Sequence, residues 1–291
     1  MKALVTAEVN SDIIKELENL IDITYEGWEK ENRVLTEEEM ISYSRDKDII
    51  ITSYDPITKK VMDQCPNLKL IVCTRSNPVN IDIKYARKKN IQISYAPGRN
   101  SDCTAEFTVA LMLAVTRKIP MAYKALKDGK HVGLKEKQQT IKAGLRRDVT
   151  WDLNDKSPYV LFKGMQLKGK TVGIIGYGSI GRRVANICGA FGMNVLINDP
   201  FFKNNDEISD VTFVSFEELL KQADVVSVHC KDCEETQNLI NARAFELMKK
   251  TAFLINTSRG ALVDEQALID ALAGKKIAGA ALDVFSSEPI A

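Results

Sequence analysis

The chain has 291 residues, and its 40 basic and 39 acidic side chains leave a formal net charge of +1. Single hydrophobic cores stop growing near roughly 250 to 300 residues, so this length predicts two domains. The balanced charge favours a small-molecule ligand over nucleic acid or anionic membranes. No apolar run reaches the roughly 18 residues of a membrane span, and no signal-peptide pattern follows Met1, so we expect a cytoplasmic protein without nucleic-acid or membrane partners.

Six cysteines are scattered through apolar segments, which is not the spacing of a secreted disulfide framework, and we expect reduced thiols. Cys230 and Cys233 form a C-x-x-C motif. No second Cys or His pair stands at zinc-ligand spacing, and redox C-x-x-C motifs usually open a helix. The sequence therefore predicts no metal site.

The first hundred residues alternate short apolar runs with amphipathic stretches, which is typical of parallel strands joined by helices. Helical patterns lie near residues 11–20, 36–46, 57–65 and 80–90, and Thr36 with Glu39 has the spacing of a capping box. The expected strands are KALVTA, IDITYE, DIIITS, LKLIVCTR and IQISYAP. We expect a first α/β domain over residues 1–98.

After Gly98 the apolar run TAEFTVALMLAVTRKI has helical periodicity and predicts a buried interdomain helix. Residues 128–168 are polar and lack a sustained period, so we expect an insertion, an arm or a mobile loop there. Their basic residues fit a solvated face better than a phosphate or nucleic-acid patch.

The second half resumes the alternation and predicts another doubly wound α/β domain with a parallel sheet, within residues 99–291. Helical patterns lie near residues 179–190, 215–222, 241–249 and 264–273. The expected strands are KTVGIIGYG, NVLIND, ADVVSVHC, TAFLINTS and IAGAALDVF.

The sequence GIIGYGSIG contains a G-x-G-x-x-G motif between an apolar strand and a helix. Two glycines there allow a pyrophosphate to approach the backbone at a helix N-terminus, and the third allows helix and strand to pack closely. The expected cofactor-binding residues of this loop are Gly176, Tyr177, Gly178, Ser179, Ile180 and Gly181.

Asp199 ends the next strand, where a carboxylate can accept hydrogen bonds from both hydroxyls of the adenosine ribose. Its charge would repel a 2′-phosphate, which favours NAD over NADP. Lys203 nearby could still favour a phosphate, so NADP stays open. A tight turn with a surface Asp is the alternative without a cofactor.

The motifs GYGSIG…NDP, VSVHC, LINTSRGALVDEQAL and AGAALDVFSSEP together resemble the D-isomer-specific 2-hydroxyacid dehydrogenases, which include phosphoglycerate dehydrogenase and glyoxylate/hydroxypyruvate reductase. The resemblance extends over essentially the whole chain. It implies a flavodoxin-like substrate domain and a Rossmann domain that binds NAD. It also implies a homodimer built by the long helix and the arm.

Carried over, the resemblance assigns Arg259 to the substrate carboxylate and carbonyl, a task that suits the planar, permanently charged guanidinium. It implies that Asp283 accepts a hydrogen bond from the nicotinamide carboxamide, and that Glu288 is the catalytic carboxylate that orients a histidine. Three further residues at the end of the same strand as Arg259 face the cofactor edge of the sheet: Asn256, Thr257 and Ser258.

In the first domain, RSNPVNID corresponds to the family loop whose backbone N–H groups hold the substrate carboxylate, which points to Ser76 and Asn77. The loop departs from the glycine-rich pattern, and Pro78 offers no N–H. The segment GRNSDCTAEF resembles the family segment that faces the nicotinamide, which implies that Asn100 contacts the substrate and Thr104 the cofactor. Capping of the following helix by Asn100 or Ser101 is an equally good local explanation.

Two further positions, Arg75 and Arg99, could meet a second anionic group on the substrate. Solvent exposure or an ion pair at the domain interface is the favoured alternative for both.

Reduction of a keto acid needs an acid that protonates the substrate oxygen as the hydride arrives. The chain has only His131 and His229, and the family's catalytic histidine would follow DVFSSEP. The resemblance gives His229 a cofactor-side position, and we expect His131 to be solvated. We expect a shortened form of a complete enzyme, because an uncovered apolar face is a liability.

The sequence therefore predicts an NAD-dependent oxidoreductase that interconverts a small 2-hydroxy acid and its 2-keto acid. The alternative is a non-catalytic NAD(H)-sensing interaction protein of the same fold. A formate dehydrogenase ranks last, because relatives acting on formate have glutamine where Glu288 stands. The identity of the hydroxy acid is left open.

Overall fold

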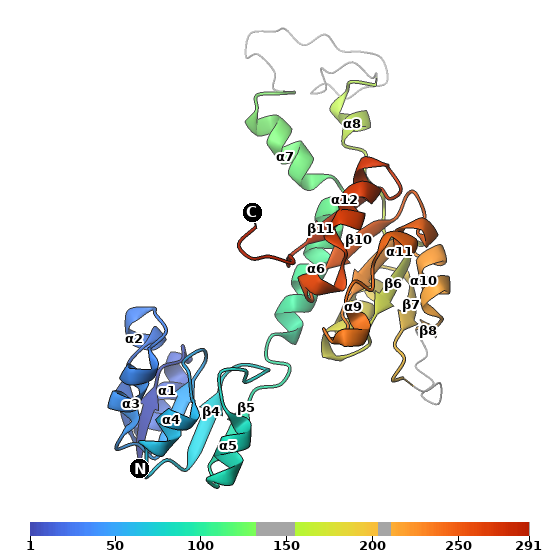
Figure 1. The fold of residues 1–291 in the computed structure, drawn as a ribbon. Helices are drawn as coiled ribbons and strands as arrows, with labels where there is room; N and C mark the ends of the chain where they lie inside the picture. The colour runs from blue at the N-terminus through green and yellow to red at the C-terminus, as the bar shows by residue number, and fades with distance from the viewer. Residues whose placement is uncertain (132–154, 203–210, 291) are drawn as a thin grey trace, which may run out of the picture. The chain divides into compact units, whose positions relative to one another are not determined.

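The computed structural model describes residues 1–131, 155–202 and 211–290. The chain divides into two compact units, Met1–Asn100 and Ser101–Ala291. Each unit contains one parallel sheet with its own helices (Figure 1). The predicted α/β class with two doubly wound sheets is confirmed.

The first unit has a five-stranded parallel sheet in the order β2-β1-β3-β4-β5, which is the flavodoxin-like order. Its strands are β1 (Lys2–Val5), β2 (Asp22–Tyr25), β3 (Ile49–Thr52), β4 (Leu70–Cys73) and β5 (Gln92–Tyr95). Its helices are α1 (Ser11–Glu18), α2 (Trp28–Glu31), α3 (Glu37–Ser44), α4 (Lys59–Asp63) and α5 (Ile83–Lys88). The predicted capping box is present at the start of α3, whereas the one-turn helix α2 was not expected.

A buried carboxylate joins the carboxyl ends of the neighbouring strands β1 and β3 of this sheet. Asp55 is 1% exposed, and its Oδ2 accepts hydrogen bonds from the hydroxyls of Thr6 (2.5 Å) and Thr52 (2.9 Å). Its Oδ1 accepts one from the N–H of Leu35 (2.8 Å). A buried charge needs this full set of donors, because each missing partner leaves its desolvation cost uncompensated.

The second unit has a six-stranded parallel sheet in the order β11-β10-β9-β6-β7-β8, which is the Rossmann order. Its strands are β6 (Thr171–Ile175), β7 (Asn194–Asn198), β8 (Thr212–Phe213), β9 (Val225–Val228), β10 (Phe253–Asn256) and β11 (Gly279–Leu282). Its helices are α6 (Ser101–Thr116), α7 (Ile119–Lys127), α8 (Pro158–Leu161), α9 (Ser179–Ala190), α10 (Phe216–Gln222), α11 (Ala242–Leu247) and α12 (Glu265–Ala273). The two-residue strand β8 was not expected.

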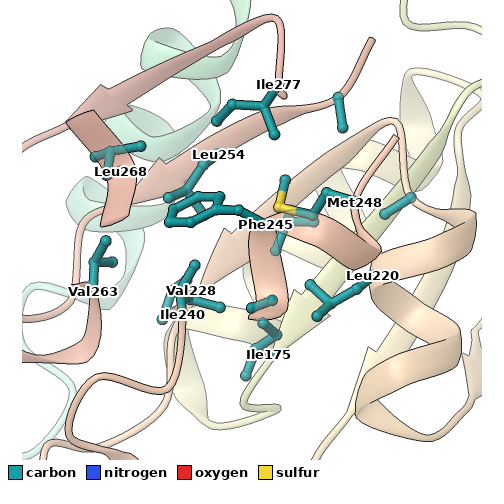
Figure 2. Close-up of a cluster of buried hydrophobic side chains, with 14 of the residues drawn as sticks. Ile175, Leu220, Val228, Ile240, Phe245, Met248, Leu254, Val263, Leu268 and Ile277 are labelled. Atoms are coloured by element: carbon teal, nitrogen blue, oxygen red, sulfur yellow. The ribbon is translucent and has the colours of Figure 1, made fainter. Parts of the chain in front are cut away.

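Two buried clusters hold this sheet from its two faces. One packs α10, α11 and α12 on the sheet, with Phe245 and Leu254 at its centre (Figure 2). The other packs α6 and α9 on the sheet through fully buried side chains such as Met112, Val184 and Ile174. Because both faces are covered, the strands read as continuous Val and Ile runs in the sequence.

The apolar run after Gly98 forms the expected helix as α6, and a second helix, α7, which was not expected, begins at the last residue of the run. Lys118 has a φ of +55°, in the left-handed region, and Pro120 lies in the first turn of α7. The chain therefore leaves α6 at Thr116 and starts a new helix at Ile119. The interdomain role of α6 stays a prediction, while within the second unit α6 packs on α9, β10 and β11.

The polar stretch 128–168 contains the short helix α8, although no regular structure was expected there. Residues 132–154 of that stretch lie outside the described residues. In the part of the chain that the structure describes, no helix has both the length and the apolar composition that crossing a membrane requires.

Candidate functional site

The strand order of the second unit reverses between β6 and β9, and open α/β sheets bind ligands at the carboxyl end of such a point. Gly176 follows β6 there with a φ of +94°. A Cβ at this position would lie 2.6 Å from the backbone N of Cys230 and 2.7 Å from the carbonyl carbon of His229. The first glycine is therefore required twice, by its backbone conformation and by direct contact with the end of β9.

The third glycine brings α9 against this loop. A Cβ on Gly181 would lie 2.1 Å from the carbonyl oxygen of Gly176, so any side chain there would push the helix away. The predicted packing role of Gly181 has a direct physical basis in this contact.

The second glycine is different, because the protein leaves space beside it. A Cβ on Gly178 would meet nothing within 4 Å, and its φ of −77° suits any residue. No described residue accepts a hydrogen bond from the N–H groups of Gly178, Ser179 or Ile180, at the N-terminus of α9. Unpaired donors, open space and the positive end of a helix dipole fit a pyrophosphate.

Asp199 lies beside this loop and is partly buried. Its Oδ2 accepts a hydrogen bond from the N–H of Tyr177 (2.7 Å), and its Oδ1 accepts one from the N–H of Phe201 (2.9 Å). Each carboxylate oxygen has two acceptor positions, so one on each oxygen is left for a ribose hydroxyl. Asp199 thus also shapes the loop, which the sequence did not indicate.

An aromatic cluster beneath the loop was missed by the sequence analysis. Tyr177 is 4% exposed and makes edge-to-face contacts with Phe202 and Phe213, at centroid distances of 5.3 and 5.7 Å. The guanidinium of Arg182 lies over Tyr177 and Phe202, and its Nε donates to the carbonyl oxygen of Tyr177 (3.1 Å). The cluster fixes the residue between the first two glycines.

The end of β10 forms a turn that is organised by Asn256. Its side chain, fully buried, donates to the carbonyl oxygen of Arg259 (2.9 Å) and accepts from the N–H of Ser258 (3.0 Å). The Ser258 hydroxyl donates to the carbonyl oxygen of Cys230 (2.8 Å), which joins the ends of β10 and β9. The amide of Asn256 is thus used inside the protein, whereas the side chain of Arg259 is exposed.

Thr257 in this turn is held by α6. Its hydroxyl is hydrogen-bonded to that of Thr108 (2.7 Å), which in turn donates to the carbonyl oxygen of Thr104 (2.7 Å). Thr257 is 7% exposed, while Thr104 is only partly buried. The structure therefore brings the two residues expected at the cofactor into one hydrogen-bonded chain.

The segment after β11 packs directly on the same turn. A Cβ on Gly260 would lie 2.0 Å from the carbonyl of Phe285, so only glycine permits the approach. Asp283 is exposed, and its N–H donates to the carbonyl oxygen of Asn256 (2.9 Å). Glu288 is exposed too, and its Oε1 accepts from the N–H of Phe285 (3.1 Å). Arg259 therefore lies in the turn after β10, and Asp283 and Glu288 lie in the segment after β11 that packs against this turn.

In the first unit, the loop after β4 carries the expected carboxylate donors. Ser76 and Asn77 are exposed, and no described residue accepts a hydrogen bond from their N–H groups. Pro78 is buried beside them. A cavity of about 470 Å³ adjoins this loop. Asn100 is also exposed, and its side chain makes no hydrogen bond with the described residues, so capping of α6 by Asn100 is not observed.

Comparison with known proteins agrees with this architecture. The model of the D-isomer specific 2-hydroxyacid dehydrogenase NAD-binding domain matches residues 109–291. A putative 2-hydroxyacid dehydrogenase, YoaD, of Bacillus subtilis is 34% identical over 99% of this chain and 78% of its own length. A glyoxylate reductase of Thermofilum pendens is 40% identical over 87% of this chain and 69% of its own length.

Among solved structures, D-2-hydroxyisocaproate dehydrogenase superposes with a TM-score of 0.80, at 26% identity over 99% of this chain and 80% of that one. The chain belongs to the D-isomer specific 2-hydroxyacid dehydrogenase family. The predicted family, the NAD-binding domain and the function as a 2-hydroxyacid dehydrogenase are confirmed at this level. The alignments leave the expectation of a shortened enzyme untested.

The roles expected for individual residues of this dehydrogenase stay predictions, although the structure shows what each one contacts. In the described residues, no group of three or more His, Cys, Asp or Glu side chains is arranged to hold a metal ion. All six cysteines are free, and burial raises the pKa of Cys230 to about 11, so its thiol is protonated at neutral pH.

His229, at the end of β9, is not suited to donate a proton at neutral pH in this dehydrogenase. Its Nε2 is hydrogen-bonded to the hydroxyl of buried Ser227 (2.8 Å), and burial lowers the pKa of His229 to about 4. The ring is therefore neutral near pH 7. His131 has a φ of +59° and makes an edge-to-face contact with Phe162, at a centroid distance of 5.7 Å.

The lowered pKa of His229 predicts a loss of stability in mild acid. The unfolded chain takes up a proton on this ring below about pH 6.5, whereas the folded protein does so only near pH 4, so stability falls as the pH falls between these values. We expect His229→Gln to remove on the order of 2 kcal/mol of the stability loss between about pH 7 and about pH 5. Urea unfolding at both pH values measures the loss of stability in the unchanged protein and in His229→Gln. An equal loss in these two proteins would contradict the assignment of the effect to His229.

Proposed function

We propose that this chain interconverts a small 2-hydroxy acid and its 2-keto acid, with NAD as the preferred coenzyme and glyoxylate or hydroxypyruvate as the simplest keto acids. The observation that carries the proposal is the loop at Gly178, where unpaired N–H groups and empty space meet at a helix N-terminus. The coenzyme, when bound, supplies the hydride that reduces the carbonyl. The protein must then bind, orient and polarise the substrate.

Asp199 and the loop hold the coenzyme in this proposal. The N–H groups of Gly178, Ser179 and Ile180 donate to the pyrophosphate, and the two free acceptor positions of Asp199 accept from the ribose hydroxyls. The same carboxylate repels a 2′-phosphate, which supports NAD over NADP. Lys203, the alternative partner for that phosphate, lies outside the described residues. Asp283 and Thr104 are assigned to the nicotinamide end.

Arg259 is assigned to the substrate carboxylate and carbonyl oxygen. Its backbone is fixed by Asn256 and by the tight contact at Gly260, while its side chain bonds only to the carbonyl of Ser258 (2.7 Å) among the described residues. A guanidinium held at its base and free at its end can grip a carboxylate bidentately. Glu288 is assigned to orienting the histidine that serves as acid and base, and Ser76, Asn77 and Asn100 add donors for the substrate.

A pair of glycines on the same helix tests the coenzyme site without turnover. Gly178→Ala fills the open space, so we expect the dissociation constant of NADH to rise at least tenfold, while the fold loses less than about 1 kcal/mol. Gly189→Ala is the control, because its Cβ also meets nothing and an alanine inside α9 should stabilise by about 0.5–1 kcal/mol. Fluorescence titration gives the dissociation constant of NADH, and urea unfolding gives the stability of each variant. Equal NADH affinity in the two variants would contradict a coenzyme site at Gly178.

Turnover is tested by NADH oxidation with glyoxylate and with hydroxypyruvate, repeated with NADPH. We expect kcat/KM with NADH to exceed that with NADPH at least tenfold. Arg259→Gln should lower kcat/KM at least about thirtyfold, since a charge-assisted bidentate contact is worth about 2–5 kcal/mol when one partner is removed. The kcat/KM of Arg259→Lys should lie between those of the unchanged protein and Arg259→Gln.

Arg243→Gln is the control for this measurement, because Arg243 is an exposed arginine of the same unit that pairs with Glu217. Absence of any protein-dependent oxidation, together with tight NADH binding, would instead favour the NAD(H)-sensing alternative.

We also propose that the chain forms a homodimer through α7 and α8. Apolar side chains are exposed along both helices, including Ile119 (54%), Tyr123 (62%) and Leu126 (56%) on α7, and Tyr159, Val160 and Leu161 on α8. The two helices are linked by a hydrogen bond from Lys118 Nζ to the carbonyl oxygen of Leu161 (3.0 Å). An exposed apolar surface of this kind is typical of an interface.

Light scattering coupled to gel filtration tests the dimer. We expect the mass of two chains for the unchanged protein and of one chain for the double variant Tyr123→Glu/Leu126→Glu. Ile269→Glu, which changes an equally exposed apolar side chain on α12, should remain dimeric. A monomer at all concentrations, or a dimer that survives the double change, would contradict this interface.

A further inference from the structure

The first residue of α6 is hydrogen-bonded to the loop that is assigned to the coenzyme. Ser101 is 1% exposed, and its hydroxyl donates to the hydroxyl of Ser179 (3.0 Å). Ser179 is the first residue of α9, and its N–H is one of the donors that have no acceptor among the described residues. The starts of α6 and α9 are therefore joined at a residue that is assigned to the pyrophosphate.

Arg183, in the second turn of α9, ties the same two helix starts together. Its Nη1 donates to the carbonyl oxygen of Ser179 (2.8 Å), and its Nε donates to the carboxylate of Asp102. One planar fork of donors thus holds the backbone of α9 and a side chain of α6. The side chain of Asp102 is 73% exposed, so this ion pair contributes little to the stability of the fold. Its removal therefore tests position more than folding.

The hydroxyl of Ser179 keeps its own hydrogen for a ligand. It accepts from Ser101, and no described residue accepts from it. A phosphate oxygen that accepts this hydrogen polarises the Ser179 oxygen and makes it a better acceptor for Ser101, because hydrogen bonds in a chain strengthen one another. A bound pyrophosphate therefore strengthens the contact between α9 and α6.

The first turns of α6 also lead to residues that are assigned to the substrate. Asn100 directly precedes Ser101 in the chain, so fixing the backbone of one restricts the other. Two turns further on, the hydroxyl of Thr108 is hydrogen-bonded to that of Thr257, in the turn that carries Arg259 (2.7 Å). The start of α6 thus connects the coenzyme loop with two groups that are assigned to the keto acid.

We propose that Ser101 and Arg183 are positioning residues of the coenzyme site, which hold Ser179 and transmit the binding of the pyrophosphate to the start of α6. This rests on the proposed function, because it takes Ser179 as a donor to the pyrophosphate and Asn100 and Arg259 as donors to the substrate. Coenzyme and keto acid then bind with positive coupling, and this coupling depends on a hydroxyl that contacts neither molecule.

The test measures this coupling without turnover, with oxamate as an unreactive analogue of a 2-keto acid. In the unchanged protein, we expect saturating oxamate to lower the dissociation constant of NADH at least about fivefold, and NADH to lower that of oxamate by the same factor, as linkage requires. Ser101→Ala and Arg183→Met should each reduce the factor to below about twofold. Arg183→Lys keeps the charge without the fork, so its factor should lie between.

Ser157→Ala is the matched control for the loss of a buried serine hydroxyl. Ser157 lies in the same unit and is 3% exposed, and its hydroxyl has no hydrogen-bond partner among the described residues. This variant should keep the coupling factor of the unchanged protein. A second comparison isolates the pyrophosphate: Ser101→Ala should weaken the binding of ADP-ribose at least about threefold and leave that of adenosine, which lacks the pyrophosphate, unchanged.

The outcomes separate this inference from the proposed function. If NADH still binds and the coupling factor is unchanged in Ser101→Ala and Arg183→Met, the positioning role is overturned while the proposed function stands. Independent binding of NADH and oxamate in the unchanged protein overturns it too, as does an equal weakening of ADP-ribose and adenosine in Ser101→Ala. A protein that binds no NADH at all contradicts the proposed function, and the inference with it.

Discussion

The contact between Gly176 and the end of β9 is the constraint on which the rest of the coenzyme site depends. Because the loop rests on the backbone of His229 and Cys230, the chain turns immediately at the end of β6. Gly181 then lets α9 start against the carbonyl of Gly176, and the first N–H groups of the helix have no acceptor among the described residues. Gly176 and Gly181 thus serve the packing of the protein, whereas Gly178 leaves room for a ligand.

Close backbone packing also positions the residues that are assigned to the substrate and to the nicotinamide. Gly260 admits the segment after β11, and Asn256 closes the turn between them with its own amide. These buried contacts fix the backbone, whereas the side chains of Arg259 and Asp283 stay exposed. Rigid support with free functional groups is the arrangement that binding a small charged molecule requires.

Much of this could be read from the sequence, because it is encoded locally. The apolar runs of the buried parallel strands, the glycine motif after β6 and the capping box of α3 are patterns of neighbouring residues. The two-residue strand β8 is too short to have a pattern. The helix α7 was not expected, because the apolar run that predicts α6 ends at Ile119, where α7 begins.

The contacts missed in the site join residues that are distant in the chain. Asp55 accepts hydrogen bonds from Leu35 and Thr6, and Arg75 stacks on Tyr54. Both contacts depend on which strands are neighbours in the sheet. The packing of Arg182 on Phe202 joins α9 to the residues that follow β7. Local propensity carries no information on such pairings; they follow only from the folded topology.

The double use of Asp199 constrains how coenzyme preference can evolve in this protein. The carboxylate that would discriminate between the two dinucleotides also holds the N–H groups of Tyr177 and Phe201. Replacing it by a small neutral residue would remove the repulsion of a phosphate and, in the same step, the support of the loop that binds the pyrophosphate. A lineage changing its coenzyme must therefore acquire a substitute for this support first, because even Asn, which removes the negative charge, keeps only one of the two acceptor oxygens.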